Sequence, residues 1–195
     1  MKTYGVILAG GRSSRFDGED KSWITWQDQP LIQHTITRIH PQVDVILISA
    51  NRHIERYQTL GFSVIADAVP DYQGPLMGIY SVMDYLSKQH ANEIKNIQLL
   101  IAPCDMPLLP LDLRQQLEQP QQPGKIHVVF ENQRLQCLLA LIPLSFIQNL
   151  GEFINNGKHK VEDWIRTTNP VIVDLSRQAA SFRNINSHAD LELLR

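Results

Sequence analysis

Two aspartates and a glycine-rich turn carry the residue types best suited to chemistry in this sequence. Asp67 and Asp105 each follow an apolar run, and Gly10 and Gly11 follow another at residues 4–7. A carboxylate just beyond a buried strand is held rigidly, and Mg²⁺ usually takes one or two protein carboxylates together with phosphate oxygens and water. We therefore predict that Asp105 binds Mg²⁺, with Asp67 as a second acid or a hydrogen-bond partner. The alternative is that both aspartates cap turns.

The glycine turn is a candidate phosphate cradle. Gly10 and Gly11 lack a Cβ atom, so backbone N–H groups there can approach an anion closely, while Arg15 and Lys21 can supply full positive charges. The stretch matches neither the Gly-x-x-x-x-Gly-Lys-Ser/Thr phosphate loop nor the Gly-x-Gly-x-x-Gly dinucleotide pattern. Taken alone, it fits a sharp turn with solvated basic residues equally well, so the other elements must decide.

Two further motifs are candidates for ligand contact. Gly74 and Pro75, followed by Gly78, can place a helix N-terminus or a close backbone beside an anion, or simply start a helix packed on a sheet. Asn184 and Asn186 alternate on an extended segment, so both amides point the same way and can read a ligand's polar edges or cap the terminal helix. Both motifs stay in the predicted site.

The remaining reactive side chains show no catalytic arrangement. No Cys-His-Asn set can be read around Cys104, which we expect to be a small buried side chain beside Asp105. The histidines lack metal-ligand spacing, so we assign no role to His34, His40, His53, His90, His127, His159 and His188.

Composition places the chain among ordinary globular proteins. With 195 residues, 43% hydrophobic content and a formal net charge of −2, it can form one domain with a substantial core and offers no broad basic surface for nucleic acid. The two cysteines and an N-terminus without a signal-peptide core predict a reduced, cytoplasmic protein. The longest apolar stretch is too short for a membrane span, so we expect no membrane partner.

Strands and helices alternate through the first half of the chain. Apolar runs at residues 4–7, 43–49, 62–66 and 97–102 predict buried strands, and helical periodicity separates them. We also predict a short strand at 22–26, a helix over 31–39, and a helix after residue 53 that Asn51 caps. This alternation predicts a parallel sheet, at whose carboxyl edge the glycine turn, Ser49, Asp67 and Asp105 converge.

The second half of the chain predicts an antiparallel addition to that sheet. Residues 119–124 are polar and proline-rich and predict a surface loop; residues 126–130 and 137–142 predict two antiparallel strands. Helices over 144–153 and 161–165, a strand at 171–174 and a terminal helix follow. The predicted fold is α/β, a single-domain three-layer α/β/α arrangement with a Rossmann-like, mainly parallel sheet.

These motifs together resemble the nucleotidyltransferases of the nucleotide-diphospho-sugar-transferase fold, and most closely the molybdenum cofactor guanylyltransferases. The shared Leu-Ala-Gly-Gly opening with a later lysine marks only the superfamily. Narrower support comes from Asp-x-x-x-Asp-Tyr-x-Gly-Pro-Leu-x-Gly at residues 67–78 and from Phe-x-Asn-Ile-Asn at residues 182–186. The likeness spans nearly the whole chain.

The resemblance implies a role for each candidate residue. Asp105 would bind Mg²⁺ and the nucleotide, Lys21 would contact its phosphates together with Arg15, and these three are the implied catalytic residues. Asn184 and Asn186 would lie toward a pterin acceptor. The implied nucleotide-binding residues are Leu8, Ala9, Gly10, Gly11, Lys21, Ser49, Asp67, Gly74, Pro75 and Asp105.

The implied reaction transfers GMP from GTP to the terminal phosphate of molybdopterin or the molybdenum cofactor. Residues 1–118 would then bind the nucleotide and residues 119–195 the acceptor, with cofactor-insertion proteins and molybdoenzymes as further partners. Ser49 departs from the family's frequent asparagine, Phe16 from its usual methionine, and Gln136-Cys137 from a polar-proline pair. Two alternatives stay open. One is a CTP-using sister enzyme acting on molybdopterin, or another sugar or cofactor nucleotidyltransferase; the other is a non-catalytic nucleotide-binding module for delivery or regulation.

Overall fold

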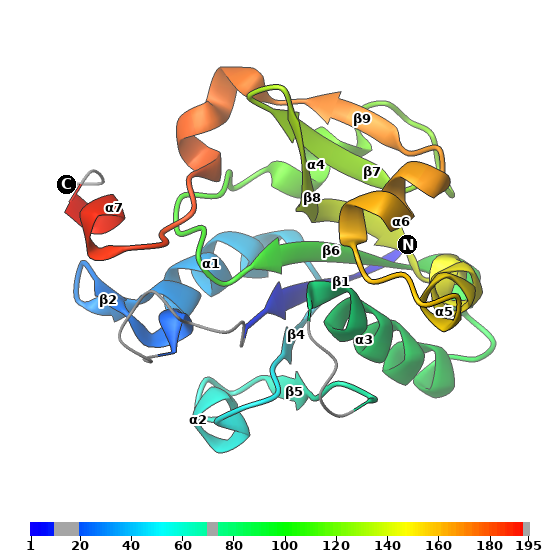
Figure 1. Cartoon of the computed structure of the whole chain (residues 1–195), viewed down its shortest axis with the longest axis horizontal. Helices are drawn as coiled ribbons and strands as arrows, with labels where there is room; N and C mark the ends of the chain where they lie inside the picture. The colour runs from blue at the N-terminus through cyan, green and yellow to red at the C-terminus, as the bar shows by residue number, and fades with distance from the viewer. Residues whose placement is uncertain (10–19, 70–73, 193–195) are drawn as a thin grey trace.

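A seven-stranded sheet forms the centre of the molecule (Figure 1), and the computed structural model describes residues 1–9, 20–69 and 74–192. Its strands, in spatial order, are β5 (Ser63–Ile65), β4 (Val45–Ser49), β1 (Lys2–Leu8), β6 (Ile97–Pro103), β8 (Arg134–Pro143), β7 (His127–Glu131) and β9 (Val171–Asp174). Apart from the strand predicted at residues 22–26, the predicted strands of both halves join this sheet.

The sheet is mainly parallel, and one of its seven strands runs against the others. β5, β4, β1 and β6 are parallel neighbours, whereas β8 is antiparallel to both β6 and β7, and β9 pairs in parallel with β7. All residues of β6 are buried, as expected for a central strand covered on both faces. The predicted fold class, with its antiparallel addition in the C-terminal half, is confirmed.

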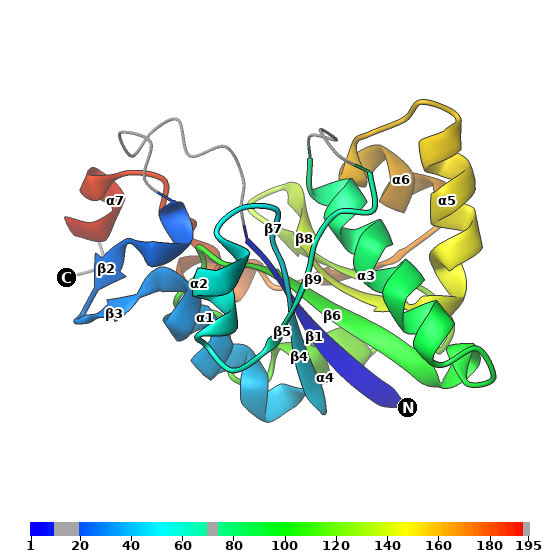
Figure 2. The ribbon, with the colours of Figure 1, turned by 90° about the horizontal axis from the view of Figure 1, so that it is seen from below.

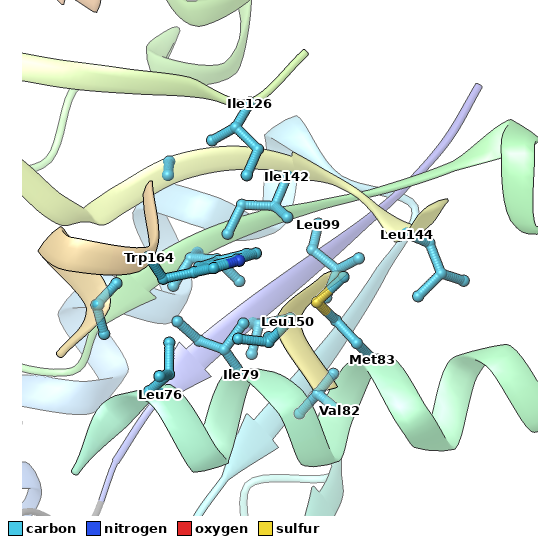
Figure 3. Close-up of a cluster of buried hydrophobic side chains, with 14 of the residues drawn as sticks. Leu76, Ile79, Val82, Met83, Leu99, Ile126, Ile142, Leu144, Leu150 and Trp164 are labelled. Carbon is cyan, nitrogen blue, oxygen red and sulfur yellow. The ribbon is translucent and has the colours of Figure 1, made fainter. Parts of the chain in front are cut away.

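Helices cover both faces of the sheet and complete three layers. α3 (Pro75–Gln89), α5 (Ile147–Asn155) and α6 (Val161–Thr167) cover one face, and α1 (Leu31–Ile39) and α4 (Leu113–Glu118) lie on the other (Figure 2). On the α3 face, Leu76, Ile79 and Met83 meet Leu150 and the fully buried Trp164 (Figure 3). These contacts fix the first turn of α3 over the carboxyl edge of the sheet.

The strand predicted at residues 22–26 is confirmed only at its end. Lys21–Trp23 forms a 3₁₀ turn, and β2 (Thr25–Trp26) pairs with β3 (Gln29–Pro30) in a two-stranded hairpin. Asp20 stabilises the turn, because its Oδ1 accepts a hydrogen bond from Ser22 N at 3.1 Å.

The prediction that Asn51 caps a helix was wrong. α2 (Ile54–Gln58) is preceded by His53 in a left-handed conformation, with φ of 50°, and no side chain caps it. The Asn51 amide bonds to Asp67 instead, because two adjacent hydrogen bonds are available there.

Three short elements lay outside the predictions or only partly within them. α4 and the 3₁₀ segment Ser176–Phe182 were not expected, and the terminal helix α7 covers His188–Glu192. None of the described helices is long and apolar enough to cross a membrane.

Candidate functional site

The carboxyl ends of four parallel strands meet at one edge of the sheet. Ala9 N donates to Ser49 O at 2.8 Å, joining the ends of β1 and β4, and Cys104 N donates to Leu8 O at 3.0 Å, joining β6 to β1. Ala50 N donates to Ile65 O at 3.1 Å and brings in β5. Ser49, Asp67 and Asp105 thus converge at this edge as predicted, whereas Gly10 and Gly11 of the predicted glycine turn lie outside the described residues.

Lys21 is the centre of a polar cluster at this edge. Its ammonium forms an ion pair with Asp105 Oδ2 and donates to Asn186 Oδ1 at 2.6 Å. The Lys21 and Asp105 side chains are only 19% and 14% exposed. Residues from the N-terminal turn, the end of β6 and the C-terminal segment therefore share one partly desolvated site, where a charge interacts more strongly than in water.

The second carboxylate oxygen of Asp105 fits a metal. Asp105 Oδ1 is buried, and among the described residues it has no hydrogen-bond partner. A buried acceptor left unpaired costs free energy unless a ligand satisfies it. Mg²⁺ takes one or two protein carboxylates with phosphate oxygens and water as its other ligands, and Asp105 Oδ1 has the chemistry of one such ligand.

Asp67 is held by a reciprocal pair of hydrogen bonds with Asn51. Asn51 Nδ2 donates to Asp67 Oδ2 at 2.6 Å, and Asp67 N donates to Asn51 Oδ1 at 2.7 Å. Burial raises the pKa of the Asp67 carboxyl above its ordinary value, and the bond from Asn51 counteracts this. Asp67 was predicted from the sequence as a site residue, whereas Asn51 was not.

The first turn of α3 packs closely against the strand ends. A Cβ atom on Gly78 would lie 2.6 Å from Ser49 Oγ, 3.6 Å from Asp67 Oδ1 and 3.7 Å from Leu8 Cδ2. Gly78 thus permits the close backbone approach that the sequence suggested. Gly74 precedes the helix with φ of 135°, and Pro75 occupies the first helical turn.

Ser49 is less available than its predicted role requires. The residue is 5% exposed and lies beneath the first turn of α3, with its hydroxyl facing Gly78. A short side chain in that position has little surface with which to reach a ligand.

A buried hydrogen-bond network stabilises the 3₁₀ turn that carries Lys21. The hydroxyl of Tyr57, a fully buried residue, donates to Asp20 Oδ2 at 2.7 Å and contacts Ser22 Oγ at 2.8 Å; Ser22 in turn bonds to Cys104 Sγ at 3.2 Å. Burial raises the pKa of the Cys104 thiol to about 12, so it stays protonated, consistent with its expected role as a buried side chain. Sequence reasoning treated Tyr57 only as a helix residue.

Four further predicted residues are Gly10, Gly11, Arg15 and Asn184. Gly10, Gly11 and Arg15 lie outside the described residues. Asn184 is partly buried, and within residues 20–69 and 74–192 its side chain makes no hydrogen bond. Between it and Asn186, Ile185 N donates to Asp105 O at 3.0 Å, which holds this segment against the site.

A cavity of about 210 Å³ lies at the opposite, amino end of β6 and has no part in this cluster. Its polar groups already bond to one another, because Gln98 Nε2 donates to Glu118 Oε1 at 2.8 Å. Both ring nitrogens of His127 face carbonyl oxygens, those of Leu117 and Gln122.

The comparisons with known proteins agree with this geometry. Residues 5–171 match the family model described as a MobA-like NTP transferase domain. The molybdenum cofactor guanylyltransferase of Shewanella woodyi is 36% identical over 184 residues, covering 93% of this chain and 90% of the relative. The chain belongs to the molybdenum cofactor guanylyltransferase family. It is accordingly a nucleotidyltransferase.

Further relatives extend the match. The molybdenum cofactor guanylyltransferase of Yersinia pseudotuberculosis is 36% identical and covers 97% of this chain and 93% of its own. The crystal structure of molybdopterin-guanine dinucleotide biosynthesis protein A from Archaeoglobus fulgidus has a TM-score of 0.76 at 19% identity, covering 97% of this chain and 95% of its own. A CMP:2-keto-3-deoxy-manno-octonic acid synthetase structure, with a TM-score of 0.72 at 15% identity and coverage of 100% and 97%, shares the fold alone.

Proposed function

We propose that this member of the family transfers GMP from GTP to the terminal phosphate of molybdopterin or the molybdenum cofactor. An oxygen of the acceptor phosphate forms the new bond to the α-phosphorus, and the bond between that phosphorus and pyrophosphate breaks. The acceptor is already an anion, so no strong general base is required. Alignment of the two anions and neutralisation of their charge are the main demands on the protein.

The meeting of Lys21 and Asp105 at the carboxyl ends of β1 and β6 is the observation that supports this proposal. Lys21 supplies a fixed positive charge for the phosphates, and Asn186 keeps its ammonium at the sheet edge. Leu8 and Ala9 lie at the end of β1, where their backbone contacts the nucleotide. Arg15 adds a second positive charge. Asn184 and Asn186 contact the acceptor.

Mg²⁺ is the proposed cofactor, and Asp105 Oδ1 is its proposed protein ligand. When bound, the metal neutralises phosphate charge. The test is Mg²⁺ titration of the Asp105→Asn variant, which keeps the size of the side chain. We expect loss of Mg²⁺-dependent pyrophosphate release with retention of the folded circular dichroism spectrum. Turnover that still saturates with Mg²⁺ at the wild-type concentration would reject Asp105 as the ligand.

The reaction itself is tested by pyrophosphate release from GTP, CTP, ATP and UTP, each with and without molybdopterin. Release that needs both GTP and acceptor supports the proposal. Greater release from CTP than from GTP would identify a cytidylyltransferase. No release from any nucleotide would favour a binding module that delivers cofactor to insertion proteins and molybdoenzymes.

A further inference from the structure

Ser49 and Asp67 are the polar side chains at the strand ends beneath the first turn of α3, where a nucleotide base could form hydrogen bonds with them. Leu8, Ser49 and Asp67 surround the Cα of Gly78, within 2.6 to 3.7 Å of the position that a Cβ atom would take there. Of the two polar side chains, Ser49 is 5% exposed under the helix, whereas Asp67 is partly open to solvent. The accessible polar group at this point is therefore the Asp67 carboxylate.

Asn51 fixes the direction of that carboxylate. Its amide donates to Asp67 Oδ2 and accepts from Asp67 N, at 2.6 and 2.7 Å. A flipped amide would set donor against donor and acceptor against acceptor, so only one orientation of Asn51 satisfies both bonds. Asp67 Oδ1 has no hydrogen bond to any described residue and faces the first turn of α3.

A carboxylate held in this way selects among bases by its chemistry. Its two oxygens only accept hydrogen bonds, and each has two lone pairs, so Oδ2 can accept a second donor beside Asn51. The Watson–Crick edge of guanine presents two adjacent donors, N1–H and the 2-amino group. Adenine and cytosine place an acceptor beside their donor, which would face a carboxylate oxygen.

We infer that Asn51 is a positioning residue that holds the Asp67 carboxylate toward the two adjacent donors of a guanine base, and that Ser49 takes no direct part in base selection. This inference rests on the proposed function, because it assumes that the nucleotide is GTP. It assigns to Asn51 a role that its expected position as a helix cap did not suggest.

The test is calorimetric binding of GTP and of inosine triphosphate, which lacks the 2-amino group. A hydrogen bond to a charged group contributes about 1.5–3 kcal/mol, so we expect the wild type to bind GTP about 10 to 150 times more tightly than inosine triphosphate. In Asn51→Ala this ratio should fall to about threefold or less. Ser49→Ala and the exposed control Asn92→Ala should keep the wild-type ratio.

Inorganic tripolyphosphate, which has no base, serves as the folding control. Its affinity should be the same in Asn51→Ala and in the wild type, because the phosphate site lies on other residues. An unchanged ratio of GTP to inosine triphosphate affinity in Asn51→Ala, or a ratio lost in Ser49→Ala, would overturn the inference alone. A wild type that binds CTP or ATP in preference to GTP would overturn the proposed function together with it.

Discussion

Lys21 and Asn186 lie 165 positions apart in the sequence and are joined by a hydrogen bond of 2.6 Å. The same ammonium pairs with Asp105, so the bond connects the segment after the glycine turn to both the central strand and the C-terminal segment. The proposed nucleotide and acceptor halves of the chain thus share one cation.

The first prediction follows from that position of Lys21. Lys21→Ala should lower turnover about 10²- to 10³-fold, the loss typical when a fixed group that stabilises transition-state charge is removed. The exposed Lys95→Ala variant is the matched control and should stay within about twofold of wild type. Initial rates of pyrophosphate release measure the turnover of both variants. Similar small losses in the two would show that Lys21 behaves as an ordinary solvated surface lysine.

Tyr57 should matter for stability. Tyr57→Phe removes the hydroxyl that bonds to Asp20 and Ser22 in a buried setting, which costs about 1–3 kcal/mol of unfolding free energy. Urea denaturation measures this loss, with the more exposed Tyr85→Phe as control. Because Asp20 caps the turn that carries Lys21, turnover should fall as well. A variant as stable as the wild type would show that the network makes no net contribution to the free energy of unfolding.

The sequence was sufficient to predict the sheet and the edge where the site lies. The runs that became β1, β4 and β6 are rich in Val, Ile and Leu, and turn residues follow each of them, so their composition and their boundaries both predict strands. Asp67 and Asp105 could be found because they come soon after the runs that became β5 and β6, and parallel strands end at a common edge. These signals are local and therefore readable from one sequence.

The contacts that orient the site could not be predicted in the same way. Asn51 precedes a helix, where asparagine commonly caps, and only the tertiary placement of Asp67 gives its amide a better partner. The hydroxyl of Tyr57 reaches Asp20 across 37 positions. The short helix α4 and the 3₁₀ turn at Lys21–Trp23 are held by packing and one cap, and they have too few residues for a periodic pattern.

The raised pKa of Asp67 predicts how stability depends on pH. The native state holds this proton more tightly than the unfolded chain, whose value is about 3.8, so the ionised carboxylate lowers stability at pH values above its native pKa. As the pH falls through the native pKa and then below 3.8, that cost disappears.

Asp67→Asn should therefore raise the thermal midpoint at neutral pH, since the amide keeps an acceptor for Asn51 and carries no charge to desolvate. The difference from wild type should shrink as the pH is lowered through the acid range. Thermal melts over a pH series measure it. A variant that melts below the wild type at neutral pH would show that the charge stabilises the fold. Greater stability together with weaker GTP binding is the expected combination for a binding residue.

The contact between Gly78 and Ser49 gives the last prediction. Replacing a helical glycine by alanine normally adds up to about 1 kcal/mol of stability, but here the new Cβ atom would lie 2.6 Å from Ser49 Oγ. Ser49 sits on the buried end of β4 and has little room to move, so the clash should outweigh the gain in helix propensity. Gly78→Ala should lower the midpoint of thermal unfolding.

The double variant Ser49→Ala/Gly78→Ala removes the clashing oxygen and should melt above the Gly78→Ala variant, which a double-mutant cycle measures as a coupling between the two sites. If the two changes are merely additive, the glycine is required for another reason, such as approach of a ligand to the α3 backbone. If they couple, close packing of α3 on β4 explains both the glycine and the small side chain at position 49. The same packing that buries Ser49 would then explain why, in the proposed site, the base meets the Asp67 carboxylate and not the Ser49 hydroxyl.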